Sequence, residues 1–217
     1  MAIYNFNQYS QATNDTVGGK ARSLMKLYDH FLVPAGFVVT ADHMAMAEIM
    51  ETFQALNLST VAVRSSAVHE DGAEATWAGQ FETYLDVDAK NLLSAVEACR
   101  QSAKSVRAKS YAEQRQIDGG AVAVIIQKMV KACVSGVAFS RHPVSGAKLV
   151  VIEAVAGSGE KLVSGRVTPD TYCVTAQSIE RAQVSGVHSV LSDEEIVSVA
   201  RLTEKVEQHM GYPVDIE

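Results

Sequence analysis

The chain has 217 residues, 47% hydrophobic and 20% charged, which is an ordinary composition for a globular protein with a hydrophobic core. Its formal net charge of −6 argues against a surface that binds nucleic acid, although a local basic site for a small anion is compatible with it. The polar N-terminus is unlike a secretory signal, and no apolar run approaches the roughly 18 residues that a membrane span needs.

Apolar spacing in the first half of the chain alternates between helical and strand-like periods. Helices are predicted from Gly19 to the region of Pro34, over 41–56, and after Asp88 with a buried stripe that reaches residue 106. Strands are predicted over 37–39, 61–63 and 80–87. This mixture indicates an α+β protein.

Gly18-Gly19-Lys20 precedes the first predicted helix. The free N–H groups at a helix N-terminus suit a phosphate. The motif is not a P-loop, because that pattern needs Gly at the position of Asn14 and Ser or Thr at the position of Ala21. A plain turn followed by a solvated lysine would give the same letters.

Arg64-Ser65-Ser66 follows the short apolar run 61–63 and leads into a polar loop with Gly79-Gln80 beyond it. The forked donors of arginine suit a polyphosphate. We therefore interpret this segment as an anion-binding strand end. The alternative is an arginine that pairs with Glu70 or Asp71 as part of the loop scaffold.

Gly119-Gly120 is the clearest internal break, and we expect two lobes, 1–118 and 119–217. The second lobe is rich in predicted strands, over 121–126, 134–139, 149–154 and 171–175. Ser192 and Glu195 form a capping-box pattern before a final helix. The segment 213–217 reads as the start of another strand.

Two more segments of the second lobe are candidates for binding. Gln127 to Val130 ends the central apolar run, where a flat base could lie against Met129, although by itself the segment is better explained as a strand end with a surface lysine. Asp215 and Glu217 are two residues apart, which on a strand places both carboxylates on one face, an arrangement that suits Mg²⁺. Two solvated acids are the alternative.

Together these motifs resemble the N-terminal nucleotide-binding domain of the phosphoenolpyruvate synthase and pyruvate phosphate dikinase family. Eight matching pieces occur in the family's order and cover nearly the whole chain. They are VGGKARSL (17–24), PAGFVVT (34–40), VAVRSSAVHED (61–71), AGQFETYL (78–85), IIQKMV (125–130), VSGVAFSRHPVSG (134–146), VIEAVAGSGEKLVSGRVTPDTY (152–172) and PVDIE (213–217).

The resemblance implies an ATP-grasp fold, in which two α+β lobes with mainly antiparallel sheets close on ATP. It implies that Lys20 and Arg64 are catalytic residues that hold the phosphate oxygens of ATP. It also implies that Gly79 and Gln80 lie in a loop near the phosphates. The adenine hinge would comprise Gln127, Lys128, Met129 and Val130, and Glu153 would also face the cleft. Asp215 and Glu217 would bind Mg²⁺.

The implied chemistry is phosphoryl transfer from Mg-ATP to a histidine on a separate domain and ultimately to pyruvate. The histidine domain and the phosphoenolpyruvate/pyruvate domain have no counterpart in this sequence, so we expect them in cis or in trans. The family's Gln-x-Arg motif after the Asp-Ile-Glu strand is also absent, and the first lobe is shorter than usual. These departures predict poor nucleotide affinity and no complete turnover for this chain alone.

Two alternatives stay open. Rifampin phosphotransferases share this nucleotide domain and use another acceptor, and a truncated, non-catalytic module that binds a partner chain would also fit. The three cysteines, Cys99, Cys133 and Cys173, are far apart and form no CxxC pair, which is typical of a reducing compartment and predicts a cytoplasmic protein. We expect no nucleic-acid or membrane partner, and the sequence leaves the oligomeric state open.

Overall fold

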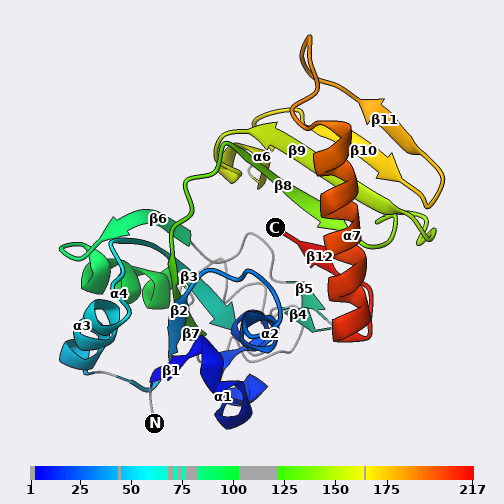
Figure 1. The fold of residues 1–217 in the computed structure, drawn as a ribbon. Coiled ribbons are helices and arrows are strands. Elements are labelled where there is room, and N and C mark those ends of the chain that lie inside the picture. The colour runs from blue at the N-terminus through cyan, green and yellow to red at the C-terminus, as the bar shows by residue number, and fades with distance from the viewer. Residues whose placement is uncertain are drawn as a thin grey trace. The chain divides into compact units, whose positions relative to one another are not determined.

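The computed structural model describes residues 3–43, 45–67, 71–72, 75–76, 83–102, 122–163 and 165–217. The chain divides into two compact units, an N-terminal unit of residues Met1–Val130 and a C-terminal unit of residues Lys131–Glu217 (Figure 1). Each unit combines helices with an antiparallel sheet of five strands, which confirms the predicted α+β class. The Gly119-Gly120 break lies outside the described residues, and the strand that follows it belongs to the N-terminal unit.

The N-terminal unit is a sheet of order β1-β2-β7-β3-β6 with short helices packed on it. Its strands are β1 (Ile3–Asn5), β2 (Gly36–Val39), β3 (Thr60–Ala67), β6 (Thr83–Asp88) and β7 (Val122–Lys128), and a separate pair is formed by β4 (Asp71–Gly72) and β5 (Ala75–Thr76). Its helices are the 3₁₀ helix η1 (Phe6–Gln11), α1 (Asn14–Val17), α2 (Gly19–Tyr28), α3 (Met46–Ala55) and α4 (Leu92–Ser102).

Strand β7 lies at the centre of this sheet and is buried on both faces, as its unbroken apolar run predicts. Alternate residues point to opposite sides. Val124 and Ile126 join the cluster formed with α3 and α4, whereas Ala123 and Ile125 join the cluster formed with η1, α1 and α2. The two faces of the sheet are therefore covered by different helices.

Several predicted boundaries of the N-terminal unit are wrong. Helix α2 ends at Tyr28 rather than near Pro34, and α3 begins at Met46 rather than at residue 41. The late start of α3 follows from a turn in which the Thr40 hydroxyl bonds the Asp42 carboxylate at 2.6 Å and the His43 amide donates to the Thr40 carbonyl. Such local side-chain bonds compete with helix formation.

Strand β6 also departs from a simple alternation. Asp86 has a φ of 53°, and the register with β3 shifts between Val61 and Val63. As a result, Tyr84 rather than Leu85 packs against the buried cluster. The irregularity is not visible in the sequence, because the alternating letters are compatible with a regular strand.

The C-terminal unit has a sheet of order β11-β10-β9-β8-β12. Its strands are β8 (Val134–Phe139), β9 (Val150–Ala156), β10 (Asp170–Val174), β11 (Ile179–Gln183) and β12 (Asp215–Ile216), and its helices are α6 (Glu160–Val163) and α7 (Asp193–Met210). Strands β8, β9, β10 and β12 correspond to predicted segments, whereas β11 and α6 were not predicted.

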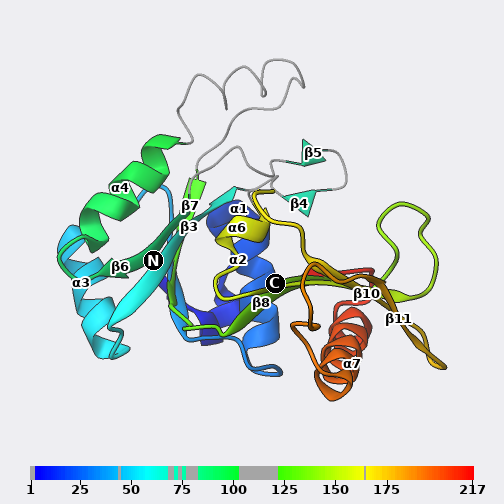
Figure 2. The same cartoon turned by 90° about the horizontal axis from the view of Figure 1, so that it is seen from above.

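Helix α7 runs along one face of this sheet (Figure 2). Its buried residues Ile196 and Ala200 pack against strand residues that point to the same face, including Ala138, Ile152 and Tyr172. The predicted capping box is confirmed, because the Ser192 hydroxyl accepts from the Glu195 amide and the Glu195 carboxylate accepts from the Ser192 amide. The Ser192 amide and the Ser192 hydroxyl both donate to the Glu195 carboxylate, and these two bonds lower the pKa of Glu195.

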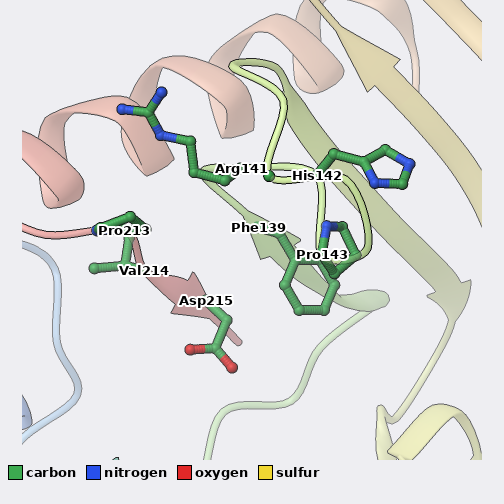
Figure 3. A pocket seen from close by; sticks show the side chains of 8 residues that line it. Phe139, Arg141, His142, Pro143, Pro213, Val214 and Asp215 are labelled. Atoms are coloured by element: carbon green, nitrogen blue, oxygen red, sulfur yellow. The ribbon is translucent and has the colours of Figure 1, made fainter. Parts of the chain in front are cut away.

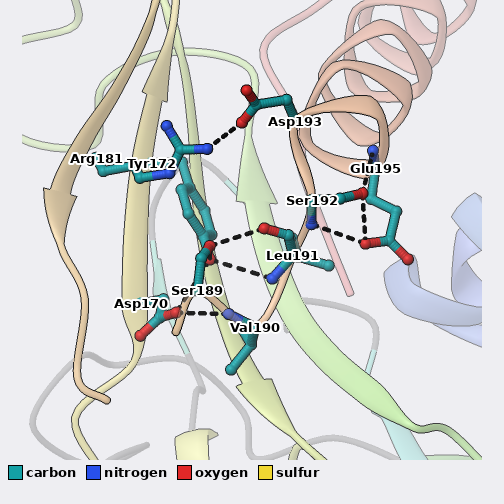
Figure 4. Close-up of polar contacts among 9 residues, drawn as sticks. All are labelled: Asp170, Tyr172, Arg181, Ser189, Val190, Leu191, Ser192, Asp193 and Glu195. Carbon is teal, nitrogen blue, oxygen red and sulfur yellow. Dashed lines mark hydrogen bonds and ion pairs between the residues drawn. The ribbon is translucent and has the colours of Figure 1, made fainter. Parts of the chain in front are cut away.

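Asp170 is a fully buried carboxylate that fastens the chain between β11 and α7 to β10 (Figure 4). One of its oxygens accepts from the Ser185 amide at 2.7 Å and the Ser185 hydroxyl at 2.9 Å, and the other accepts from the Val190 amide at 2.9 Å and the Tyr172 hydroxyl at 3.1 Å. Burial alone would raise the pKa of Asp170, but these hydrogen bonds hold the pKa below its usual value. The charged Asp170 carboxylate thus holds the chain between β11 and α7 in place, although this described segment forms no helix or strand.

Across the described helices, no stretch combines the length and the apolar character that crossing a lipid bilayer would require.

Candidate functional site

In the N-terminal unit, the Gly-Gly-Lys motif and the Arg-Ser-Ser motif meet at the start of α2. The Ala21 amide, in the first turn of the helix, donates to the Ser66 hydroxyl at 3.0 Å. Ser66 is fully buried, and by accepting this bond its hydroxyl caps the helix from 45 residues away in the sequence. The sequence identified both motifs as anion-binding candidates, and this hydrogen bond explains how they are held together.

Gly18 makes this contact sterically feasible. Its φ is +79°, and a Cβ built on it would lie 2.4 Å from the Ser66 carbonyl oxygen. No side chain fits at that distance, so the backbone of the Gly-Gly turn can touch β3 only because position 18 is glycine. The close approach brings the first turn of α2, with Lys20, against the Ser66 end of β3.

Arg64 lies on the same side of the sheet as α2. It pairs in register with Ile125, a member of the cluster that contains α2. Because side chains of directly paired residues point to one face, Arg64 is directed toward the α2 side, where its side chain is half-buried. Lys20 and Arg64, the two predicted phosphate ligands, are thus placed on one face of one unit.

The prediction that the strand stops at Val63, before this motif, is wrong, because β3 continues through Arg64, Ser65 and Ser66 to Ala67. Alternation then sends the two hydroxyls to opposite faces. Ser66 faces α2, whereas Ser65 pairs with Val124 on the α3 and α4 side and is 3% exposed. A phosphate on the α2 side could therefore use Arg64 but not Ser65.

The proposed adenine hinge, Gln127 to Val130, leaves the sheet at the end of β7. The Gln127 side chain is buried and donates to the Pro34 carbonyl at 3.3 Å. The Lys128 amide donates to Ala35 and the Met129 amide to Thr60, so these two N–H groups are engaged within the unit. The hinge remains a prediction, and a base there would need other groups, such as the exposed Val130.

Gly79 and Gln80 lie outside the described residues, as do His69 and Glu70 of the same loop. Their predicted places near the phosphates stay predictions.

In the C-terminal unit, the predicted acidic residues share one face of the sheet. Asp215 pairs with Phe139, and Val137 pairs with Glu153 on the other side of β8. Glu217 follows the last residue of β12, Ile216, which pairs with Ala138, and continued alternation would place Glu217 on the same face as Asp215. Even-numbered neighbours such as Ala138 and Ile216 face α7. The three carboxylates therefore belong to the face opposite α7.

These carboxylates differ in exposure. Asp215 and Glu217 are exposed, and Glu153 is half-buried. Cys173 lies on the same face of the sheet, where burial and the nearby Glu180 raise the pKa of its thiol. That thiol is therefore neutral near pH 7, and the hard oxygen ligands on this face are carboxylates.

A pocket of about 500 Å³ lies beside Asp215 (Figure 3). It is formed where the chain leaves β8 and where it enters β12, and its lining residues are Phe139, Arg141, His142, Pro143, Gly146, Pro213, Val214 and Asp215. Its volume is within the range of small-molecule sites.

The two basic residues of this pocket have structural partners. Arg141 extends toward α7, where its Nε and Nη2 atoms donate to Glu207 at 3.1 and 2.5 Å (Figure 3). The His142 Nδ1 atom accepts from the Val144 and Ser145 amides, each at 3.2 Å, and closes the turn that the sequence predicts there. No local pattern indicates that this turn lines a pocket, because the other lining segment, residues 213–215, is far away in the sequence.

Among the described residues, no group of three His, Cys, Asp or Glu side chains is close enough to hold a metal ion. The acidic face nevertheless fits Mg²⁺ of the kind that is bound by one or two carboxylates and completed by substrate phosphates and water. Asp215 and Glu217 are the residues that would supply those carboxylates.

Comparison with known proteins identifies the family. Residues 43–189 match the model of the pyruvate phosphate dikinase AMP/ATP-binding domain, which is more than half of the chain. A probable phosphoenolpyruvate synthase from Archaeoglobus fulgidus is 40% identical over 72% of this chain and 24% of its own length. The phosphoenolpyruvate synthase from Pyrococcus furiosus is 36% identical over 72% of the chain and 24% of its own length.

A third relative, the uncharacterized phosphotransferase YvkC from Bacillus subtilis, is 31% identical over 96% of this chain and 32% of its own length. That alignment spans 268 positions, more than the 217 residues here, so the Bacillus protein contains residues without a counterpart in this chain. The chain spans about a quarter to a third of the length of these relatives. It belongs to the pyruvate phosphate dikinase AMP/ATP-binding domain family.

Proposed function

We propose that the chain binds Mg-ATP as the nucleotide-binding portion of a dikinase-type phosphotransferase. The observation that carries the proposal is the junction of α2 with β3, where the Ser66 hydroxyl caps the helix that begins with Gly19-Lys20. A helix N-terminus, a lysine and a half-buried arginine on one face of the unit form a site with the charge and the donors that a polyphosphate needs.

The role that we propose for Lys20 and Arg64 is to hold and orient the phosphate oxygens. Arg64 is well suited, because its backbone is fixed by β6 on one side and by β7 on the other. From this fixed backbone position, the planar fork of the guanidinium can contact two oxygens at once. Gly79 and Gln80 are proposed to lie near the same phosphates.

In the same proposal, the two units are the lobes of an ATP-grasp domain. Adenine lies along Gln127, Lys128, Met129 and Val130, and Glu153 faces the cleft. Asp215 and Glu217 hold Mg²⁺, which supplies positive charge that neutralises the transferring phosphoryl group. The carboxylates themselves orient the ion, and Lys20 and Arg64 balance the negative charge that develops on the phosphate oxygens.

The acceptor is proposed to be a histidine on another domain, from which the phosphoryl group passes to pyruvate. Support comes from the names of the relatives, two of which are a phosphoenolpyruvate synthase and a probable one. We place the protein in the cytoplasm, because Cys99, Cys133 and Cys173 are free thiols, as is usual in a reducing compartment.

Isothermal titration of the chain with ATP in the presence of Mg²⁺ tests this function. Arg64→Ala should weaken ATP binding roughly 10- to 100-fold, since a charge-assisted bond contributes about 1.5–3 kcal/mol. Arg201→Ala is the matched control, because Arg201 is an exposed arginine on α7, and it should bind ATP like the wild type. Equal affinities of all three proteins for ATP, or no binding by the wild type, would contradict the proposal.

A further inference from the structure

Ser140 follows β8 directly and is 3% exposed, although it is a polar residue. Its amide and its hydroxyl both form hydrogen bonds with Val214, a residue of another segment. The Ser140 amide donates to the Val214 carbonyl at 2.9 Å, and the Ser140 hydroxyl accepts from the Val214 amide at 2.8 Å. Ser140 thus holds both backbone groups of the residue that immediately precedes Asp215.

This pair extends a very short ladder. Strand β12 has two residues, which pair with Phe139 and Ala138 of β8, and Val214 opposite Ser140 adds a third row. In that row the hydroxyl takes the acceptor role that a backbone carbonyl has in a regular antiparallel pair. An edge strand with so few bonds depends strongly on each of them.

The consequence concerns the direction of two side chains. Side chains alternate between the faces of a strand, so the twist and register of β12 decide where Asp215 and Glu217 point. Losing the anchor at Val214 would free the entry of the strand and let both carboxylates move relative to Glu153 on β9.

We propose that Ser140 is a positioning residue that sets the divalent-metal affinity of the Asp215 and Glu217 carboxylates. It acts through the backbone of Val214 and does not touch the metal or the nucleotide. The proposal rests on the proposed function for its metal, and it rests on the hydrogen bonds to Val214 for its mechanism.

Ser140→Ala removes the hydroxyl acceptor and leaves the backbone bond. Hydrogen exchange of the Val214 amide should accelerate roughly five- to tenfold, the equivalent of about 1 kcal/mol for one lost hydrogen bond. In ATP titrations, the Mg²⁺ concentration at half-saturation should rise roughly tenfold, the effect expected when the support of a metal ligand is lost. ATP affinity measured in EDTA should not change.

Ser140→Thr keeps a hydroxyl and should restore both the slow exchange at Val214 and the Mg²⁺ dependence. Ser189→Ala is the matched control. It also deletes a hydroxyl bonded within the C-terminal unit, but the bonds of that hydroxyl are to Leu191 and Tyr172 and not to Val214. A general loss of stability would affect both alanine variants, whereas a positioning role shifts the Mg²⁺ dependence of Ser140→Ala alone.

The outcomes separate the two proposals. Wild-type binding of Mg-ATP with an unchanged Mg²⁺ dependence in Ser140→Ala overturns the role of Ser140 and leaves the proposed function standing. If the wild type does not bind ATP, the proposed function fails. Hydrogen exchange of the Val214 amide in Ser140→Ala then tests whether Ser140 anchors β12. Unchanged exchange in Ser140→Ala would overturn that role as well.

Discussion

The two units hold their candidate ligand residues by different means. Arg64 is in the middle of β3, an inner strand of eight residues that is hydrogen-bonded to β7 and β6. Asp215 is on β12, an edge strand of two residues next to β8. On an inner strand many hydrogen bonds fix the backbone position from which the side chain extends. On a short edge strand it depends on a few local bonds.

The two units also differ in how segments outside their main sheets are held in place. In the N-terminal unit a steric contact, Gly18 against Ser66, sets the place of a helix. In the C-terminal unit polar anchors, Asp170 and Ser140, set the place of segments outside the main ladder. Steric contacts tolerate no added atoms, whereas polar anchors fail when a partner is removed, and substitutions should separate the two kinds.

Gly18→Ala should have the largest effect. Its Cβ would collide with the Ser66 carbonyl in a backbone conformation that favours glycine, and we expect a loss of about 4 kcal/mol in the free energy of unfolding. Gly157→Ala is the matched control, because Gly157 has the same φ of +79° but no atom within 4 Å of its added Cβ. It should cost about 1 kcal/mol.

Urea denaturation measures both variants. Similar losses for Gly18→Ala and Gly157→Ala would mean that backbone conformation alone matters, and the steric account of the junction between α2 and β3 would be wrong.

Asp170→Asn should come next, with a loss of about 3 kcal/mol in the free energy of unfolding. The amide nitrogen of asparagine is a donor, so it would face groups that themselves donate to Asp170. Asp193→Asn is the control, since Asp193 is an exposed residue paired with Arg181 and should cost less than about 1 kcal/mol. Urea denaturation of both variants provides the measurement, and equal losses would show that Asp170 is no anchor.

The lowered pKa of Asp170 gives this anchor a pH dependence. The folded state holds the carboxylate charged more strongly than the unfolded chain does, so the contribution is fully present above about pH 4, the usual pKa of an unfolded aspartate. It is lost as pH falls toward the lower pKa of the folded state. The difference in unfolding free energy between the wild type and Asp170→Asn should therefore shrink below pH 4, and a constant difference would contradict this account.

The smallest effects are expected for the two helix caps. Ser66→Ala removes the cap of α2 and Ser192→Ala the cap of α7, and each should cost about 1 kcal/mol. If the proposed function holds, Ser66→Ala should also weaken ATP binding, because it loosens the helix start that carries Lys20. Ser192→Ala should leave ATP binding unchanged. Urea denaturation and calorimetric ATP titration measure the two effects. If Ser66→Ala and Ser192→Ala bind ATP with equal affinity, the cap of α2 does not contribute to the phosphate site.

Much of the fold could be predicted because the signals were local. The capping box of α7, the apolar run of β7 and the strand at β8 each follow from neighbouring residues. The errors arise where distant contacts override local patterns. The sequence predicts a strand that ends at Val63, but β3 continues to Ala67 because β7 pairs with it from Val61 to Ala67.

For the candidate site, the sequence supplies residues whose binding roles stay predictions, and it says little about their geometry. Lys20, Arg64, Asp215 and Glu217 stand out from motif order alone. The structure adds that Ser65 and Ser66 face opposite sides and that the Lys128 and Met129 amides are already engaged. It also adds Ser140, whose single letter in a turn-like segment carries no signal of its role.

By itself, the sequence determined the α+β class, the family motifs and the local caps, because each depends on residues a few positions apart. Only the tertiary structure decided that Ser66 caps α2 from 45 residues away and that Ser140 holds Val214 from 74 residues away. Such bonds depend on which strands become neighbours. Pairing is settled by burial of whole faces of the sheet, and no local pattern of residues encodes the partner.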